Sequence, residues 1–64
     1  MWTYCYYTEK YEENGCQIIR AVFKSLNTEK SEFVKFEQDP SDEEIKNRCE
    51  NIAYQMTLNS IGIA

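Results

Sequence analysis

The chain has 64 residues, with 11 Asp and Glu against 7 Lys and Arg and a net charge of −4. A chain of this length forms one domain, residues 1–64, whose core alone rarely supplies more than about 3–5 kcal/mol of net stability. The three cysteines, Cys5, Cys16 and Cys49, are too few and too irregularly spaced for a disulfide framework, and without histidine they do not complete a zinc site. We therefore expect reduced cysteines, no metal and no cofactor.

The sequence carries no signal for secretion or for membrane insertion. Its start, MWTYCYYTEK, lacks a basic segment followed by an apolar one, and no apolar run approaches the ~18 residues of a membrane span. We expect a cytoplasmic protein without membrane contact. The abundance of Glu, Ile, Lys, Asn and Tyr is typical of AT-rich coding sequences, such as those of many phages and low-GC bacteria.

Residues 2–11 and 16–26 predict an antiparallel hairpin. The first segment is rich in aromatic residues and the second alternates in character, and both features favour strands. Asn14 and Gly15 between them are the strongest short signal for a type I′ turn. A two-residue loop at this point pairs Glu9 with Arg20. It also places the following residues opposite each other: Tyr7 and Val22, Thr8 and Ala21, Tyr6 and Phe23, Cys5 and Lys24.

A third strand is predicted over residues 31–38, after a polar four-residue turn at 27–30. This loop length sets Phe23 against Val34 and Arg20 against Glu37, so that Arg20 would lie between Glu9 and Glu37. Residues of odd number on the second strand then form the core face. With their neighbours they predict an apolar set of Tyr4, Tyr6, Ile19, Ala21, Phe23, Val34 and Phe36.

A C-terminal helix is predicted over residues 42–59. Pro40 ends the preceding strand, and Ser41 with Glu44 forms a capping box. The helix carries an apolar stripe of Ile45, Cys49, Ile52, Ala53 and Met56, with Tyr54 and Leu58 roughly opposite. The predicted fold is therefore α+β: a three-stranded antiparallel meander, β-β-β-α, with one helix packed on one face. Residues 60–64 carry no prediction.

One helix covers only one face of such a sheet, and the reverse face would retain large apolar side chains. Contiguous exposed patches of this kind are typical of interaction sites, although the stems of charged residues can also cover such rings. We predict a non-catalytic protein-binding module, a small regulator or inhibitor of the phage or mobile-element type that docks on a larger host or cognate protein. Its predicted contact residues are Tyr7, Tyr11, Arg20, Val22, Phe33 and Lys35.

Other functions have less support in the sequence. Without histidine or paired carboxylates there are no candidate catalytic residues, and the negative charge with no RNA-binding motif argues against nucleic acid as partner. A homodimer, formed through strand edges or stacked open faces, is a further hypothesis. The main alternative is an acidic inhibitor that mimics nucleic acid in the basic groove of its target. It would use Glu12, Glu13, Glu29, Glu32, Asp39, Asp42, Glu43, Glu44 and Glu50.

Overall fold

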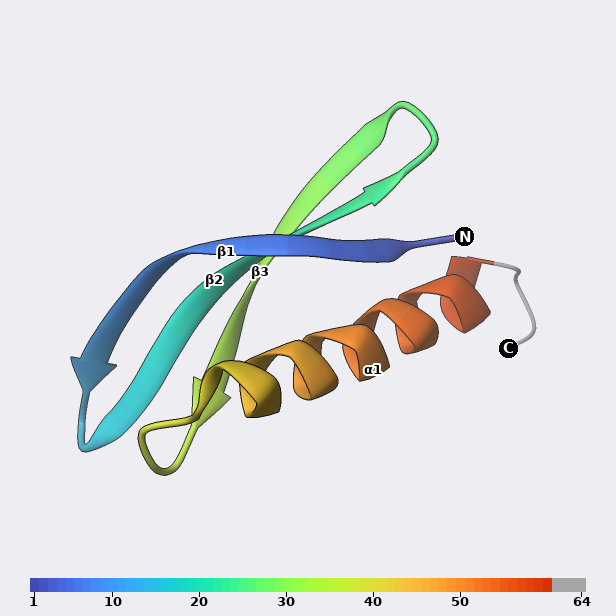
Figure 1. Ribbon diagram of the computed structural model, residues 1–64. Helices are drawn as coiled ribbons and strands as arrows, with labels where there is room; N and C mark the ends of the chain where they lie inside the picture. The colour runs from blue at the N-terminus through green and yellow to red at the C-terminus, as the bar shows by residue number, and fades with distance from the viewer. Residues whose placement is uncertain (61–64) are drawn as a thin grey trace.

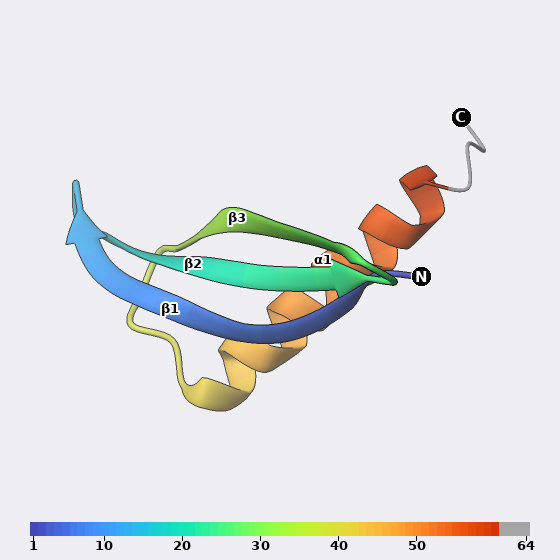
Figure 2. The ribbon, with the colours of Figure 1, turned by 90° about the horizontal axis from the view of Figure 1, so that it is seen from above.

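The computed structural model describes residues 1–60; the end of the chain, residues 61–64, lies outside the described part. Three strands, β1 (Thr3–Glu13), β2 (Cys16–Ser25) and β3 (Thr28–Phe36), are followed by one helix, α1 (Asp42–Ser60). The strands form one antiparallel sheet in the order β1-β2-β3. The sheet is strongly twisted, and α1 lies along one of its faces (Figures 1 and 2). The predicted α+β architecture is confirmed.

The first hairpin turns at Asn14 and Gly15, as predicted. Both residues have positive φ, 55° and 81°, which is the conformation that a type I′ turn requires at its two loop positions. The predicted register holds from Glu13, opposite Cys16, as far as Glu9, opposite Arg20. The turn therefore fixes the pairing of the neighbouring half of β1.

Beyond Glu9 the predicted register is wrong, because β1 contains two register shifts. Each shift leaves one residue of β1, first Thr8 and then Cys5, without a partner on β2. Each unpaired residue shifts the pairing by one position. The side chains beyond it therefore lie on the opposite face from the one that an unshifted register would give them. As a result Tyr7 lies opposite Ala21 on the helix side, and Tyr6 lies opposite Val22 on the reverse side. Tyr4, after the second shift, returns to the core face that the sequence predicts for it.

The second hairpin is tighter than predicted. Its loop consists of Leu26 and Asn27, and Ser25 pairs with Thr28. The register between β2 and β3 consequently differs from the predicted one by four residues, with Ile19 opposite Val34 and Arg20 opposite Phe33. Because four is an even number, Val34 and Phe36 still lie on the core face. The predicted pairing of Arg20 with Glu37 is wrong, since β3 ends at Phe36.

The core lies between the sheet and α1. Phe23, Ile19, Ile45 and Cys49 are its largest fully buried side chains, and Trp2, Tyr4, Tyr7, Ile52 and Met56 pack around it. The apolar stripe predicted for the helix thus faces the sheet. At the start of α1 the Ser41 hydroxyl accepts a hydrogen bond from the Glu44 backbone N–H, and the Glu44 carboxylate accepts one from the Ser41 N–H. The capping box is confirmed.

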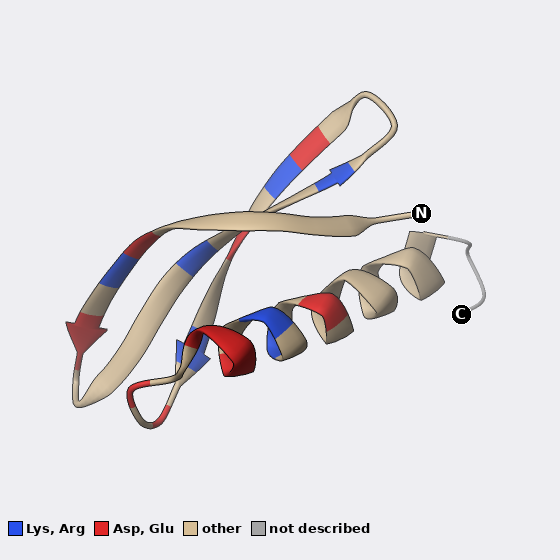
Figure 3. Cartoon of the chain, in the orientation of Figure 1, with Lys and Arg blue, Asp and Glu red and all other residues tan. Residues whose placement is uncertain are grey.

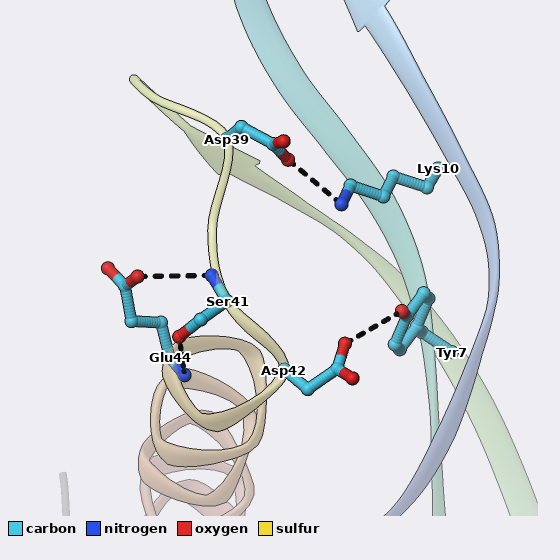
Figure 4. A network of polar contacts seen from close by, with 6 residues as sticks. All are labelled: Tyr7, Lys10, Asp39, Ser41, Asp42 and Glu44. Carbon is cyan, nitrogen blue, oxygen red and sulfur yellow. Dashed lines mark hydrogen bonds and ion pairs between the residues drawn. The ribbon is translucent and has the colours of Figure 1, made fainter.

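Polar contacts tie β1 to both ends of the helix. At one end, drawn in Figure 4, Lys10 forms an ion pair of 2.9 Å with Asp39, and the Tyr7 hydroxyl makes a long hydrogen bond of 3.5 Å to Asp42. At the other end the Trp2 backbone N–H donates to the Thr57 hydroxyl at 2.8 Å. These contacts link β1 and the residue before it to the start and to the last turns of α1.

Candidate protein-binding face

The side of the sheet that faces away from α1 is the candidate site. We call it the open face and define it by Tyr6, Tyr11, Ile18, Arg20, Val22, Phe33 and Lys35. Together with Glu9 and Ser31, these residues form three rows across the strands: Glu9–Arg20–Phe33, Tyr6–Val22–Ser31 and Tyr11–Ile18–Lys35. No second layer from residues 1–60 covers this side (Figure 2).

Three aromatic side chains of the open face are accessible to a partner. Phe33 is 65% exposed, Tyr6 49% and Tyr11 40%. Val22, in contrast, is only 5% exposed, because it lies on the central strand between the neighbouring positions Tyr6 and Ser31. The accessible rings therefore come from the two outer strands, and Val22 forms the floor between them.

The structure brings five of the six predicted contact residues to this face. Tyr11, Arg20, Val22, Phe33 and Lys35 all lie on it, whereas the prediction for Tyr7 is wrong. The shift at Thr8 turns Tyr7 toward the helix, where it packs against the core.

Tyr6 is the residue that sequence reasoning missed. Its neighbour Tyr7 has the same side chain, so local composition does not distinguish the two positions. Only the unpaired Thr8, a feature that the pairing of the two strands reveals, decides which tyrosine faces outward.

The charges of the open face are largely paired within the chain. Arg20 lies 3.7 Å from Glu9, and Lys24 lies 3.8 Å from Glu29. Exposed pairs of this kind contribute about 0–1 kcal/mol each, but they reduce the net charge that a partner meets. Within residues 1–60, Lys35 has no carboxylate within ion-pair distance. Among the described residues of the open face, Lys35 is therefore the cation without a paired carboxylate.

The three cysteines differ in exposure: Cys5 is exposed, Cys16 is half-buried and Cys49 is buried. Cys5 is exposed at the second register shift of β1, and Lys24 lies opposite Thr3 rather than Cys5, contrary to the predicted register. Cys49 is fully buried, and this burial raises the pKa of its thiol to about 11. A protonated, inaccessible thiol is a poor nucleophile. Across the described part of the chain, no three potential ligand side chains gather closely enough to hold a metal ion.

A separate groove lies on the helix side of the molecule. It has a volume of about 250 Å³ and opens between the start of β1 and the outer flank of α1, where Trp2, Tyr4, Ala53 and Tyr54 form much of its wall. Tyr54 is exposed there, as the sequence predicts. Because this groove is remote from the open face, Tyr54 provides a control for experiments on Tyr6 and Phe33.

In residues 1–60 no helix combines the length and the apolar character that crossing a bilayer demands. Comparison with known proteins gives no match to a family model, to a curated protein or to a solved structure.

Proposed function

We propose that the protein is a non-catalytic binding module, a small regulator or inhibitor that docks on a larger protein through its open face. The observation that carries this proposal is the exposure of Phe33, Tyr6 and Tyr11 on the face of the sheet that residues 1–60 leave uncovered. Aromatic side chains bury a large area at low entropic cost, and they are frequent among the residues that dominate binding energy.

The chemistry of the face indicates the kind of partner. Tyr6, Tyr11 and Phe33 would enter apolar depressions, and Arg20, already paired with Glu9, would border them. Lys35 needs a carboxylate from the partner, because a charge that is desolvated without a counter-charge opposes binding. The partner that fits is a protein surface with apolar pockets and an acidic group at one margin.

The test is a paired substitution with a matched control. The wild-type chain, immobilised and exposed to an extract of its source cells, identifies the partner, and the affinity of that partner is then measured for each variant. We expect Tyr6→Ala with Phe33→Ala to weaken binding by more than about 2 kcal/mol, as for hot-spot residues. Tyr54→Ala removes a similarly exposed aromatic ring from the helix, and this control should leave the affinity unchanged.

The result that contradicts the proposal is equally definite. If the double variant binds the partner as tightly as the wild type, the open face is not the docking surface. Far-UV circular dichroism of each variant is measured first, because a loss of folding would also abolish binding. Since Tyr6 and Phe33 lie outside the core, both substitutions should leave the helical signal intact.

Mimicry of nucleic acid by acidic residues is the second candidate function. Asp42, Glu43 and Glu44 occupy the first turn of α1, and β1 ends in Glu12 and Glu13. Figure 3 places lysines and arginines close to both acidic segments, and Asp39, Glu29 and Glu32 are each paired with a lysine.

The acidic charge is therefore divided rather than gathered in one continuous strip, and the mimicry hypothesis has less support. It predicts binding that weakens steeply with salt and with the change Glu43→Lys, and that is indifferent to Phe33→Ala.

A further inference from the structure

Within residues 1–60, the outer edge of β3 presents backbone groups without a hydrogen-bond partner. Ser25 and Thr28 flank a two-residue loop, and the residues that flank such a loop exchange both hydrogen bonds. Hydrogen-bonded pairs then recur at every second residue, so the even-numbered residues of β3 direct their backbone groups toward β2. The backbone groups of Glu29, Ser31, Phe33 and Lys35 point outward instead.

Arg48 occupies one of these outward groups. Its guanidinium stacks on the ring of Phe36, with 4.8 Å between the central carbon and the ring centroid, and donates a hydrogen bond of 3.3 Å to the Lys35 carbonyl. The free part of the edge is therefore limited to Glu29, Ser31 and Phe33. This stretch is centred on Ser31.

The two edges of the sheet differ in their suitability for pairing. β1 has two register shifts, which bend an edge and interrupt its regular row of donors and acceptors. β3 pairs with β2 over nine residues without a shift. An edge with an unbroken register and a regular row of free groups is the form that accepts another strand.

We propose that β3 pairs antiparallel with β3 of a second copy of this chain, with Ser31 on the two-fold axis. Ser31 then exchanges hydrogen bonds with Ser31 of the second copy, and Glu29 pairs with Phe33 in both directions. This register uses each of the three free residues and ends where Arg48 covers Lys35. It joins two sheets of three strands into one continuous sheet.

The charges of β3 favour this register over its neighbours. Lys30 and Glu32 lie 3.3 Å apart on the helix side of the same strand. Around the two-fold at Ser31, each Lys30 lies opposite Glu32 of the second copy, so four charges alternate in sign. Moving the axis to Lys30 or to Glu32 would set like charges directly opposite each other, which is destabilising.

The space beside this edge is compatible with a second copy. A groove of about 450 Å³ lies between Lys30 and Glu32 on β3 and the flank of α1, where Ile52, Gln55 and Met56 contribute to its wall. The two-fold axis is perpendicular to the sheet, so both helices lie on the same side and the two grooves meet. Both open faces lie on the other side of the joined sheet, where the pairing of the two β3 strands does not cover them. The dimer is therefore independent of the docking role proposed above.

The first test is the mass of the protein in solution. Sedimentation equilibrium between 1 and 200 µM should give twice the chain mass of 7.6 kDa at the higher concentrations. Ser31→Pro removes the backbone N–H at the centre of the proposed contact and leaves the hydrogen bonds between β3 and β2 intact. Proline is tolerated at such edge positions. We expect it to raise the dissociation constant at least about tenfold. Ser31→Ala retains the N–H and should preserve the dimer.

Charge reversal provides a second and independent test. Lys30→Glu or Glu32→Lys alone places like charges across the axis and should weaken the dimer, and the two changes together should restore it. Phe33→Ala should leave the mass unchanged, although it weakens docking in the function proposed above. A wild-type chain that remains monomeric at 200 µM would overturn the proposal. Loss of the dimer through Phe33→Ala but not through Ser31→Pro would also overturn it, since the open faces would then be the contact.

Discussion

The buried thiol of Cys49 makes the protein less stable at alkaline pH. Cys49 has no exposed surface, and burial raises the pKa of its thiol from 9.0 to about 11, an effect that the charge of Arg48 opposes. The folded protein thus holds this proton more tightly than the unfolded chain does. The resulting stability is complete below pH 9 and is lost as the pH rises through 11.

The size of the effect follows from the difference between the two pKa values. A difference of about two units corresponds to about 2.7 kcal/mol at high pH, and about 1.4 kcal/mol of this is lost at pH 10. A core of this size rarely supplies more than about 3–5 kcal/mol, so the loss is a large fraction of the total. Burial also raises the pKa of Tyr4, and the hydrogen bond to Asp39 raises that of Lys10, so both groups destabilise the protein in the same alkaline range. A variant is needed to isolate the thiol.

The effect of the thiol is separated from those of Tyr4 and Lys10 by comparing the wild type with Cys49→Ala. Both are unfolded in urea at pH 7.5 and at pH 10, and unfolding is monitored by far-UV circular dichroism. The wild type is expected to be the more stable at pH 7.5, because the variant leaves a small cavity. Its advantage should shrink by about 1.4 kcal/mol at pH 10. Cys5→Ala, at an exposed position, should follow the wild-type pH dependence. An advantage of the wild type over Cys49→Ala that is equal at both pH values would refute the reasoning.

Three further predictions concern the two faces of the sheet, the cap at the start of α1 and the turn at Leu26. Phe23→Ala should cost about 3–5 kcal/mol of stability and unfold most of the protein. Phe33→Ala, at a position that is 65% exposed, should change the urea midpoint little. Similar losses of stability in the two variants would contradict the assignment of faces. Ser41→Ala removes the hydroxyl that caps α1 and should cost about 1 kcal/mol of unfolding free energy in urea, with no loss expected if the cap contributes nothing. Leu26 is 98% exposed with a φ of 55°, so Leu26→Asn should raise the thermal midpoint by relieving about 1 kcal/mol of strain, and a lower midpoint would show that the leucine is not strained.

The local signals in the sequence are sufficient for the elements and their order. Asn14 and Gly15 specify a turn because both tolerate positive φ, and Ser41 with Glu44 specifies the start of α1 because their side chains satisfy free backbone N–H groups. The alternation along β2 and the apolar spacing along α1 then define which sides of these elements form the core. These features depend on neighbouring residues alone, and each of them is found in the structure.

The register beyond the first turn depends on contacts that no local pattern contains. Thr8 and Cys5 are left unpaired so that Tyr4, Tyr7 and Trp2 can all pack toward α1, and the second loop contracts to Leu26 and Asn27 although leucine is a poor residue for positive φ. Burial of side chains against a distant helix outweighs the small cost of the two unpaired residues in β1. The sequence by itself therefore determined the elements and the core face of β2. Only tertiary packing decided that Tyr6, and not Tyr7, lies on the open face.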